Sequence, residues 1–317
     1  MYEDLTEVFN RFYEKYKDKR IIFCGHRHSD IDAIASAYAL SEAFPNSIVA
    51  YVDEMDTPAK HLCETMGIKA NDIKEINLDE YDGVVAVDTS SSILMPIDKS
   101  KIIGIFDHHT ENENTIKAKF EIKDENARST AEIVANVMGF KFNKNVATAL
   151  ATAIISDTYR FITASHTTLE TFNKLMNMSG KEYEELLNLA YPKRHYDEVN
   201  AILTAFKRAE WEEINGYTIV WSHVSSAGSS AAGKLAEVGD IAIVVSWDEK
   251  LNATKVSLRG GPFEPLRLDK VANHLGKIFS GGGGGHPKAA GALCREKPEV
   301  VLRYGVQLIK ERLKSLN

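Results

Sequence analysis

Acidic and imidazole side chains gather at four places in this sequence, each where a strand or a helix is expected to end. The residues are Asp107, His108 and His109, then Asp88, then His26, Asp30 and Asp32, and finally Asp157. Carboxylate oxygens with a few imidazole nitrogens, and without clustered thiolates, form a ligand set that suits hard divalent ions such as Mn²⁺ and Mg²⁺. These residues therefore point to metal-assisted chemistry.

The elements that must position these side chains form a β-α-β series. Apolar runs predict strands at 20–24, 47–52, 83–88 and 102–107, and amphipathic patterns predict helices at 31–44 and 57–66. Such alternation is typical of a parallel sheet, and open α/β sheets hold their ligands at the carboxyl ends of the strands. We therefore expect acids that follow separate strands to meet at one edge of the sheet.

The remainder of the chain predicts further helices and then a second, smaller domain. Helical periodicity dominates from Ser129-Thr130-Ala131-Glu132, which has the form of a capping box, to about residue 191. An amphipathic run from Asp197 to Trp211 is interpreted as a connecting helix. Later patterns predict strands at 217–224, 241–248 and 252–259 and helices at 229–237, 268–279 and 298–316. The predicted fold is α/β, with a parallel-sheet metal-binding domain at 1–195, a linker helix and smaller α/β domain at 196–317, and an active site in the cleft between them.

The candidate ligands divide into two groups that share one carboxylate. His26, Asp30 and Asp88 would hold one ion, and Asp32, Asp88, His108 and Asp157 would hold the other. Four carboxylates balance two divalent ions, for which Mn²⁺ is the first choice and Mg²⁺ or Co²⁺ are substitutes. Two such ions can polarise a phosphoryl oxygen and activate water for in-line attack on phosphorus. A single aspartate after a strand is more often a helix cap or turn former, which is the alternative for Asp30 and Asp32, and Asp157 could be only a polar helix end.

Composition narrows the class of protein. The 317 residues are 44% hydrophobic and 26% charged, with a formal net charge of −7, which disfavours long nucleic acids because their backbones bind basic surfaces. Cys24, Cys63 and Cys294 show no close pairing, so neither a disulfide framework nor a zinc ribbon is expected. The sequence has no pattern of a signal peptide or a membrane span. We therefore expect a cytoplasmic protein without a membrane anchor.

A run of glycines at 281–285 leads into His286. Taken alone, such a run is usually a flexible linker. A linker here would separate only one strand-like segment and a helix from the rest of the chain, whereas the backbone N–H groups of consecutive glycines can wrap an anion. We therefore expect an anion-binding loop that includes Gly283, Gly284, Gly285 and His286.

With these motifs in order, the chain closely resembles the DHH phosphoesterase superfamily, in the RecJ-related subgroup that carries the DHH-associated C-terminal domain. The motifs are Gly25 to Ala33, Val87-Asp88-Thr89-Ser90, Asp107-His108-His109, Ser129 to Glu132 with Asp157-Thr158, and Ser257-Leu258-Arg259 with 282–291. They span nearly the whole chain. The sequence departs from the family pattern at His28-Ser29 and Ile31, where Asn-Pro and Gly are frequent, and at Tyr159-Arg160, where glycine is common.

The resemblance implies a site of two manganese ions with the ligand division given above. It also implies that His109 lies beside the reacting phosphate and that Asp107 supports the site without binding metal. In similar proteins the second domain closes over the metal site, and here Arg259, Gly283, Gly284, Gly285 and His286 would contact the substrate. An arginine can pair with a phosphate through two hydrogen bonds. The resemblance further implies a homodimer.

Within the superfamily, the sequence favours hydrolysis of small nucleotides. The chain lacks the extra domains of the long single-strand exonucleases and the spans of the membrane-bound enzymes, and its glycine-rich motif argues against the inorganic pyrophosphatases. We expect a manganese-dependent phosphodiesterase that cleaves cyclic di-AMP and short linear oligoribonucleotides to nucleoside 5′-monophosphates. The alternatives are a 3′-phosphoadenosine 5′-phosphate phosphatase and a non-catalytic nucleotide-binding regulator. A regulator that has lost turnover should lack at least one metal ligand, and all six candidate ligands are present.

Overall fold

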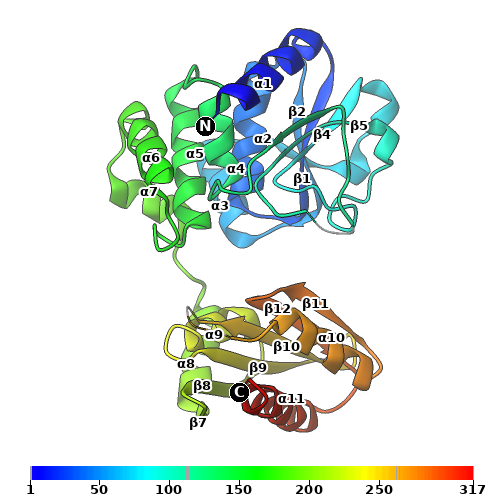
Figure 1. Ribbon diagram of the computed structural model, residues 1–317, viewed down its shortest axis with the longest axis vertical. Helices are drawn as coiled ribbons and strands as arrows, with labels where there is room; N and C mark the ends of the chain where they lie inside the picture. Colours follow the sequence, from blue (N-terminus) through cyan, green and yellow to red (C-terminus); the bar gives the residue numbers. More distant parts are fainter. Residues whose placement is uncertain (1, 112–113, 262, 264, 317) are drawn as a thin grey trace. The chain divides into compact units, whose positions relative to one another are not determined.

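The structure is a computed structural model that describes residues 2–111, 114–261, 263 and 265–316, with the side chain of His286 left out. The chain divides into two units, residues 1–193 and 194–317. Each unit is built on a six-stranded sheet with helices packed against it (Figure 1). This arrangement confirms the predicted α/β class with a parallel N-terminal sheet and a second, smaller domain. Within the described residues, no helix has both the length and the apolar character needed to cross a bilayer.

The sheet of the first unit has the strand order β3-β2-β1-β4-β5-β6, and each neighbouring pair is parallel. The strands are β1 (Ile21–Ser29), β2 (Ile48–Met55), β3 (Ala70–Asp72), β4 (Gly83–Val87), β5 (Ile102–Asp107) and β6 (Phe120–Lys123). The chain adds β2 and β3 on one side of β1 and then returns to place β4 on the other side. This reversal makes the carboxyl ends of β1 and β4 a topological switch point, where open α/β sheets bind their ligands.

Both faces of this sheet are covered, which explains the long apolar runs in its strands. Every residue of β4 is buried, with Val84 and Ala86 in one core and Val85 and Val87 in the other. Unbroken apolar strands of this kind suit a parallel sheet. The helices that contribute to the larger core are α1 (Glu3–Tyr16), α2 (Ile31–Ala43), α3 (Thr57–Met66), α4 (Thr130–Val137), α5 (Lys144–Asp157), α6 (His166–Ser179) and α7 (Tyr183–Ala190). Figure 1 shows α5, α6 and α7 as neighbours.

The smaller core lies on the other face of the sheet, where short elements replace long helices. It includes Ile73 at the start of a 3₁₀ helix, together with Met95 and Ile116 from connecting segments. The short helices are η1 (Ile73–Glu75), η2 (Leu78–Glu80) and η3 (Lys99–Lys101). The long helices of the unit therefore gather on one face.

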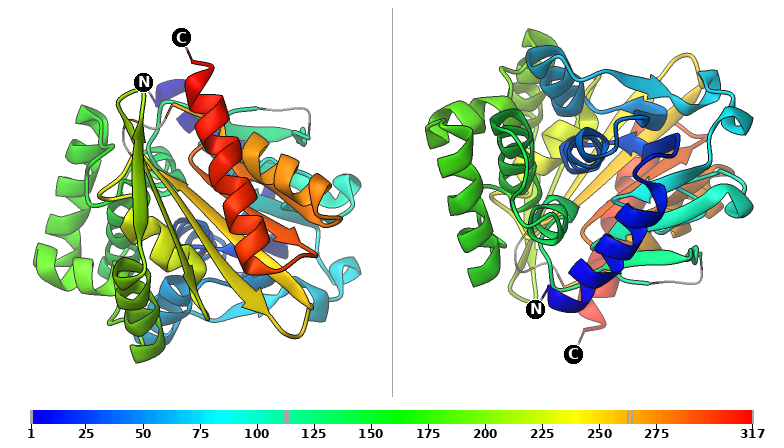
Figure 2. Two further views of the ribbon diagram at one scale, coloured as in Figure 1. Left: turned by 90° about the horizontal axis from the view of Figure 1, so that it is seen from below. Right: turned by 90° about the horizontal axis from the view of Figure 1, so that it is seen from above.

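The second unit has a mixed sheet in the order β11-β12-β10-β9-β8-β7, in which β8 and β9 are parallel and the other pairs are antiparallel. The strands are β7 (Glu210–Ile214), β8 (Tyr217–Val224), β9 (Ile241–Asp248), β10 (Ala253–Gly260), β11 (Gly282–His286) and β12 (Ala289–Cys294). The helices are α8 (Tyr196–Lys207) and α9 (Gly228–Leu235) on one face, and α10 (Leu268–Ile278) and α11 (Pro298–Lys314) on the other. Figure 2 shows α10 and α11 side by side on their face of the sheet.

The connecting helix expected from Asp197 to Trp211 is shorter than predicted. α8 ends at Lys207, and Trp211 lies in β7. The cause is the hairpin that joins β7 to β8, in which Asn215 and Gly216 have φ values of 52° and 79°. An Asn-Gly pair is a strong hairpin signal because both central residues of a type I′ turn need positive φ. The turn therefore makes residues 210–214 a strand.

The glycine run is also different from the expected loop. Residues 282–286 form the edge strand β11, which pairs antiparallel with β12. A Cβ atom on Gly283 would lie 2.0 Å from the carbonyl oxygen of Ala272 in α10. Gly285 has a φ of 133°, which residues with a side chain rarely adopt. Gly283 is therefore required for close packing of this strand against α10, and Gly285 is required for the backbone conformation of the strand.

Candidate metal centre

The candidate centre forms at the switch point of the parallel sheet. His26 lies in the second half of β1, Asp88 directly follows β4, and His108 directly follows β5. The start of α2 supplies two more acids, and α5 ends at Asp157. The fold therefore brings together, within the first unit, residues that are far apart in the sequence.

Asp88 lies in the middle of these residues. Its carboxylate is 3.4 Å from His26 Nε2, 3.5 Å from His108 Nε2 and 3.8 Å from His109 Nδ1, and the side chain is only 2% exposed. Its φ is 62°, a left-handed conformation that aspartate tolerates better than most residues. Backbone strain of this kind often occurs at functional sites. Asp88 is therefore placed to serve more than one ligand set.

Among the residues that the structure describes, three sets of donor atoms lie close enough together to hold a metal ion. The sets are His26, Asp30 and Asp88; Asp32, His108 and Asp157; and Asp88, His108 and His109, with all atoms of a set within 4.8 Å of one another. The first set equals one of the two groups expected from the sequence. The second contains the other group except Asp88, which lies 3.5 Å from His108. The third contains His109, for which the resemblance implies a phosphate contact instead.

Asp32 also has a structural role. The residue is fully buried, and its carboxylate oxygens accept hydrogen bonds of 2.6 Å from the backbone N–H of Thr130 and 2.9 Å from that of Ala131. These N–H groups belong to the first turn of α4, where donors have no partner within the helix. Burial raises the pKa of Asp32 well above its usual range, and the charges of Asp88 and Asp157 raise it further. Asp32 thus joins the starts of α2 and α4.

Asp30 combines a cap with membership of the cluster. It is the N-cap of α2, and its Oδ1 accepts a 3.0 Å hydrogen bond from the N–H of Ala33. Burial, followed by the charges of Asp88 and Asp157, raises the pKa of Asp30 to about 7. Carboxyl groups that resist ionisation beside one another indicate a shortage of positive charge, which a divalent ion would supply. The donor set and its electrostatics therefore fit a hard divalent metal.

Asp107 holds His109 in position. Its Oδ1 accepts a 3.1 Å hydrogen bond from the backbone N–H of His109 and lies 2.8 Å from Nδ1 of the ring. Asp107 is fully buried, whereas 45% of the His109 side chain is exposed. Burial acts to lower the pKa of His109, but Asp107 and the charge of Asp88 raise it above its usual value. The contact with Asp107 therefore fixes the orientation of the His109 ring.

His26 and His108 are protonated at neutral pH when no metal is bound. Burial acts to lower both pKa values, but a hydrogen bond to Asp88 and nearby charges raise the pKa of His26 to about 9. A hydrogen bond to Asp157 and the charge of Asp88 raise the pKa of His108 to about 10. An imidazole must lose this proton to bind a metal ion, so metal and protons compete for the same nitrogens.

Binding of Mn²⁺ at pH 7 is therefore expected to release protons and to become tighter as the pH rises toward these pKa values. The apparent affinity should increase about tenfold per pH unit for each proton displaced. Titration calorimetry in buffers with different ionisation enthalpies measures the number of protons released. An affinity that stays constant across this pH range would contradict the assignment of both histidines as ligands.

The residues expected to contact the substrate lie on neighbouring strands of the second unit. Arg259 in β10 and the backbone of His286 in β11 both pair with Ala289 of β12. They therefore lie at one level of the sheet, two strand spacings or about 10 Å apart. The Arg259 guanidinium donates a 2.5 Å hydrogen bond to Ser229 Oγ near the start of α9. Gly283, Gly284 and Gly285 belong to the same strand as His286.

Thr130 is a contact of the centre that the sequence did not identify. Its Oγ1 donates a 2.8 Å hydrogen bond to Asp88, and its backbone N–H bonds to Asp32. The only signal was the motif at 129–132, interpreted as a capping box. Ser129 does accept a hydrogen bond from the N–H of Glu132, but the Glu132 carboxylate accepts from Tyr2 and Thr168, so the box is not completed. The start of α4 instead donates hydrogen bonds to Asp32 and Asp88 of the centre.

Comparison with known proteins gives matches in both units. Residues 20–155 match the DHH family, N-terminal domain, and residues 223–314 match the DHHA1 domain. An uncharacterized protein of Methanocaldococcus jannaschii is 28% identical over 297 residues, which cover 88% of each chain. Two solved structures at lower identity show the same fold.

The first of these structures is an exopolyphosphatase-related protein from Bacteroides fragilis, with a TM-score of 0.78, 16% identity and coverage of 98% of each chain. The second is a pGpG-specific phosphodiesterase from Vibrio cholerae, with a TM-score of 0.51 and 14% identity. That match covers 94% of this chain and 99% of the other.

Proposed function

Since this chain belongs to the DHH superfamily of metal-dependent phosphoesterases, with a DHH domain followed by a DHHA1 domain, we propose that the cluster around Asp88 is its catalytic centre. The observation that carries this proposal is the meeting of two carboxylate and imidazole donor sets at the switch point, each set within 4.8 Å. Mn²⁺ is the proposed metal, with Mg²⁺ or Co²⁺ as substitutes. Two bound ions would polarise a phosphoryl oxygen and lower the pKa of a water molecule.

The residues of the chain hold the ions and orient the phosphate. The proposed ligands are His26, Asp30 and Asp88 for one ion, and Asp32, Asp88, His108 and Asp157 for the other. His109, fixed by its 2.8 Å contact with Asp107, donates a hydrogen bond to a phosphate oxygen. A hydrogen bond to Asp107 and the charge of Asp88 raise the pKa of His109 against the opposing effect of burial, which favours the protonated ring. Thr130 holds the carboxylate of Asp88 through its 2.8 Å hydrogen bond.

The proposed substrates are small nucleotides, namely cyclic di-AMP and short linear oligoribonucleotides, which are cleaved to nucleoside 5′-monophosphates. The name of the Vibrio cholerae relative, a pGpG-specific phosphodiesterase, supports this substrate class. The net charge of −7 favours a local phosphate contact over attraction of a long polymer. Arg259 is the proposed contact because its guanidinium can pair with a phosphate through two hydrogen bonds. Gly283, Gly284, Gly285 and His286 are proposed to line the same substrate site.

A reducing, cytoplasmic setting fits this proposal. Cys24, Cys63 and Cys294 are all buried free thiols. Thiols persist in the cytoplasm because its redox systems keep them reduced. Nucleotide substrates of the proposed kind would be met in the same compartment.

A substrate panel tests the proposed activity. The Mn²⁺-loaded protein would be incubated separately with cyclic di-AMP, a linear dinucleotide, longer RNA, 3′-phosphoadenosine 5′-phosphate and inorganic polyphosphate. We expect the two dinucleotides to be hydrolysed fastest, with nucleoside 5′-monophosphate as the product. Preferred release of inorganic phosphate from the bisphosphate would favour the phosphatase alternative, and binding without turnover of any compound would favour the regulator. Preferred cleavage of polyphosphate would contradict both nucleotide activities.

The same assay tests the substrate contact in the second unit. Arg259→Ala is expected to raise KM for the dinucleotide about tenfold while changing kcat less. The reason is that a charge-assisted pair with a phosphate that does not react stabilises the bound substrate as well as the transition state. Arg267→Ala is the matched control, since the guanidinium of Arg267 pairs with Asp269 in the same unit. An unchanged KM in the Arg259 variant would remove this residue from the proposed site.

A further inference from the structure

A pocket lies between α1 and the beginning of β6, within the first unit. Its volume is about 470 Å³. The residues that line it are Val8, Arg11, Ala118, Lys119, Phe120 and Glu121. Phe120 is the first residue of β6, whereas the metal centre lies where the strands of this parallel sheet end. The pocket and the centre have no residue in common, so the pocket is a separate feature of the unit.

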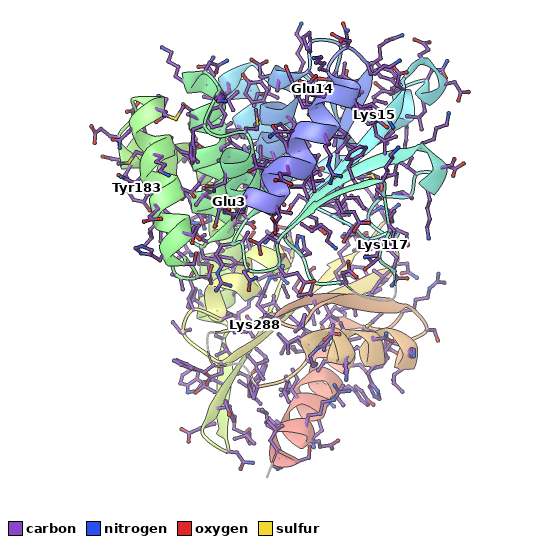
Figure 3. All side chains as sticks on the ribbon, turned by 45° about the horizontal axis from the view of Figure 1, so that its top comes forward. Glu3, Glu14, Lys15, Lys117, Tyr183 and Lys288 are labelled. Carbon is purple, nitrogen blue, oxygen red and sulfur yellow. The ribbon has the colours of Figure 1, made fainter. Side chains whose placement is uncertain are left out.

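Three cationic side chains gather at this pocket. Arg11 and Lys15 lie one turn apart on α1, and Lys119 belongs to the segment before β6. Lys15, labelled on α1 in Figure 3, and Lys119 have their Nζ atoms 5.8 Å and 5.9 Å from the centroid of one ring, that of Phe120. The contact with Lys15 and the charge of that residue lower the pKa of Lys119. The two ammonium groups are thus close enough to repel each other.

The carboxylates nearby pair with other lysines. Glu14 on α1 pairs with Lys17 at 2.7 Å. Glu121 lines the pocket, but its carboxylate lies 3.7 Å from Lys117 Nζ. Among the residues that the structure describes, none of the three cations forms an ion pair with a carboxylate. The pocket therefore has an excess of positive charge, although the net charge of the protein is −7.

The base of the pocket is held by the core of the unit. Phe120 is buried, and its ring lies 5.5 Å from that of Phe12 and 6.0 Å from that of Tyr16, measured between centroids. One lysine over an aromatic ring can stabilise a fold. A second lysine at the same ring adds repulsion between like charges, which destabilises the compact state. The cluster of cations is therefore better suited to binding an anion than to stabilising the unit.

We propose that this pocket is a second anion site, which binds the phosphate group of a small ligand. A phosphate monoester carries a charge of about −1.5 to −2 at neutral pH, and guanidinium and ammonium groups form charge-assisted hydrogen bonds to its oxygens. Val8 and Ala118 line the same pocket and offer apolar surface to the remainder of a ligand. A nucleic acid would need a longer basic surface than this one pocket. The site does not depend on the proposed function, because no residue of the metal centre contributes to it.

Equilibrium binding to the full chain in chelator tests this site apart from metal binding. Titrations with inorganic phosphate and with adenosine 5′-monophosphate at low salt should each saturate, whereas adenosine should not bind. Arg11→Gln and Lys119→Gln are each expected to weaken phosphate binding about threefold, and the double variant about tenfold. Glu121→Gln should tighten it about twofold, because it removes the negative charge that lines the pocket. Lys17→Gln is the matched control, since Lys17 lies beside the same helix but pairs with Glu14, and it should leave the affinity unchanged.

Thermal unfolding without phosphate separates a binding role from a structural one. Lys119→Gln is expected to unfold at the same temperature as the wild type or a higher one, because the substitution removes the repulsion by Lys15. A lower temperature would overturn the inference by assigning the cations to the fold. Absence of saturable phosphate binding would also overturn it, as would an equal loss of affinity in Lys17→Gln.

The two ligands distinguish the sources of the phosphate. Tighter binding of adenosine 5′-monophosphate would identify an organic monoester as the ligand, and equal binding would identify inorganic phosphate. Because these measurements involve neither metal nor turnover, their failure would leave the proposed function intact. Absence of dinucleotide hydrolysis in the substrate panel would likewise leave this site intact.

Discussion

Replacement of Asp88 with asparagine is expected to lower the turnover of a dinucleotide by about a thousandfold or more. The carboxylate lies 3.4 Å from His26 and 3.5 Å from His108, so its loss disturbs both proposed ligand sets. Loss of several kcal/mol of transition-state stabilisation by positioned ions corresponds to about this factor. The substitution is nearly isosteric, and asparagine tolerates the φ of 62° as aspartate does. The effect should therefore report the charge of the ligand.

Two measurements and one control variant make this prediction specific. Product release gives kcat, and the rise in unfolding temperature on addition of Mn²⁺ gives metal binding independently of turnover. Asp53→Asn is the matched control because Asp53 also has a φ of 62° but pairs with Arg27 and Lys74, each at 2.5 Å. The control should keep both properties. Full turnover in the Asp88 variant would refute its bridging role.

Asp32→Asn is expected to lower the free energy of unfolding by roughly 1–3 kcal/mol even when a chelator has removed all metal. Both oxygens of Asp32 accept backbone N–H groups, from Thr130 at 2.6 Å and Ala131 at 2.9 Å. Both can accept whether or not the carboxyl group is ionised. An asparagine has one oxygen, and its amide nitrogen cannot accept. One buried donor at the start of α4 would therefore lose its partner.

Asp30→Asn provides the comparison for this variant. Asp30 caps α2 through one hydrogen bond from the N–H of Ala33, and asparagine is as good an N-cap as aspartate. Chemical unfolding in chelator should therefore leave Asp30→Asn close to the wild type and Asp32→Asn clearly less stable. Equal midpoints for the two variants would contradict the structural role of Asp32.

The centre of the first sheet could be predicted because its signals are local. β4 is a short run of buried apolar residues followed at once by Asp88, and parallel strands must end at a common edge. The edge strands could not be predicted in this way. β3 has three residues and β6 has four. Segments this short do not show a recognisable hydrophobic pattern of a strand. They are strands because β2 and β5 offer them hydrogen-bonding partners.

Contacts between distant segments could not be predicted from the sequence, for a different reason. The spacing at 129–132 predicts a helix start, but it does not say which buried carboxylate will face that start, so the contact of Thr130 with Asp88 was missed. A run of glycines such as that at 281–285 can form a linker, a loop or a strand, so composition alone does not distinguish these structures. Only packing decides, as the closeness of Gly283 to Ala272 shows. The Asn215-Gly216 turn, by contrast, was a readable signal that the preceding helical periodicity obscured.

The switch point also has a consequence for how the chain matures. His26 belongs to the first strand of the sheet and Asp157 to the end of α5, so two metal ions held by ligand sets that share Asp88 would together act as a cross-link across most of the first unit. Closing so long a loop restricts the unfolded chain. On a ribosome this cross-link could not form until α5 had emerged. Metal supply would then decide how long a newly made first unit resists proteases.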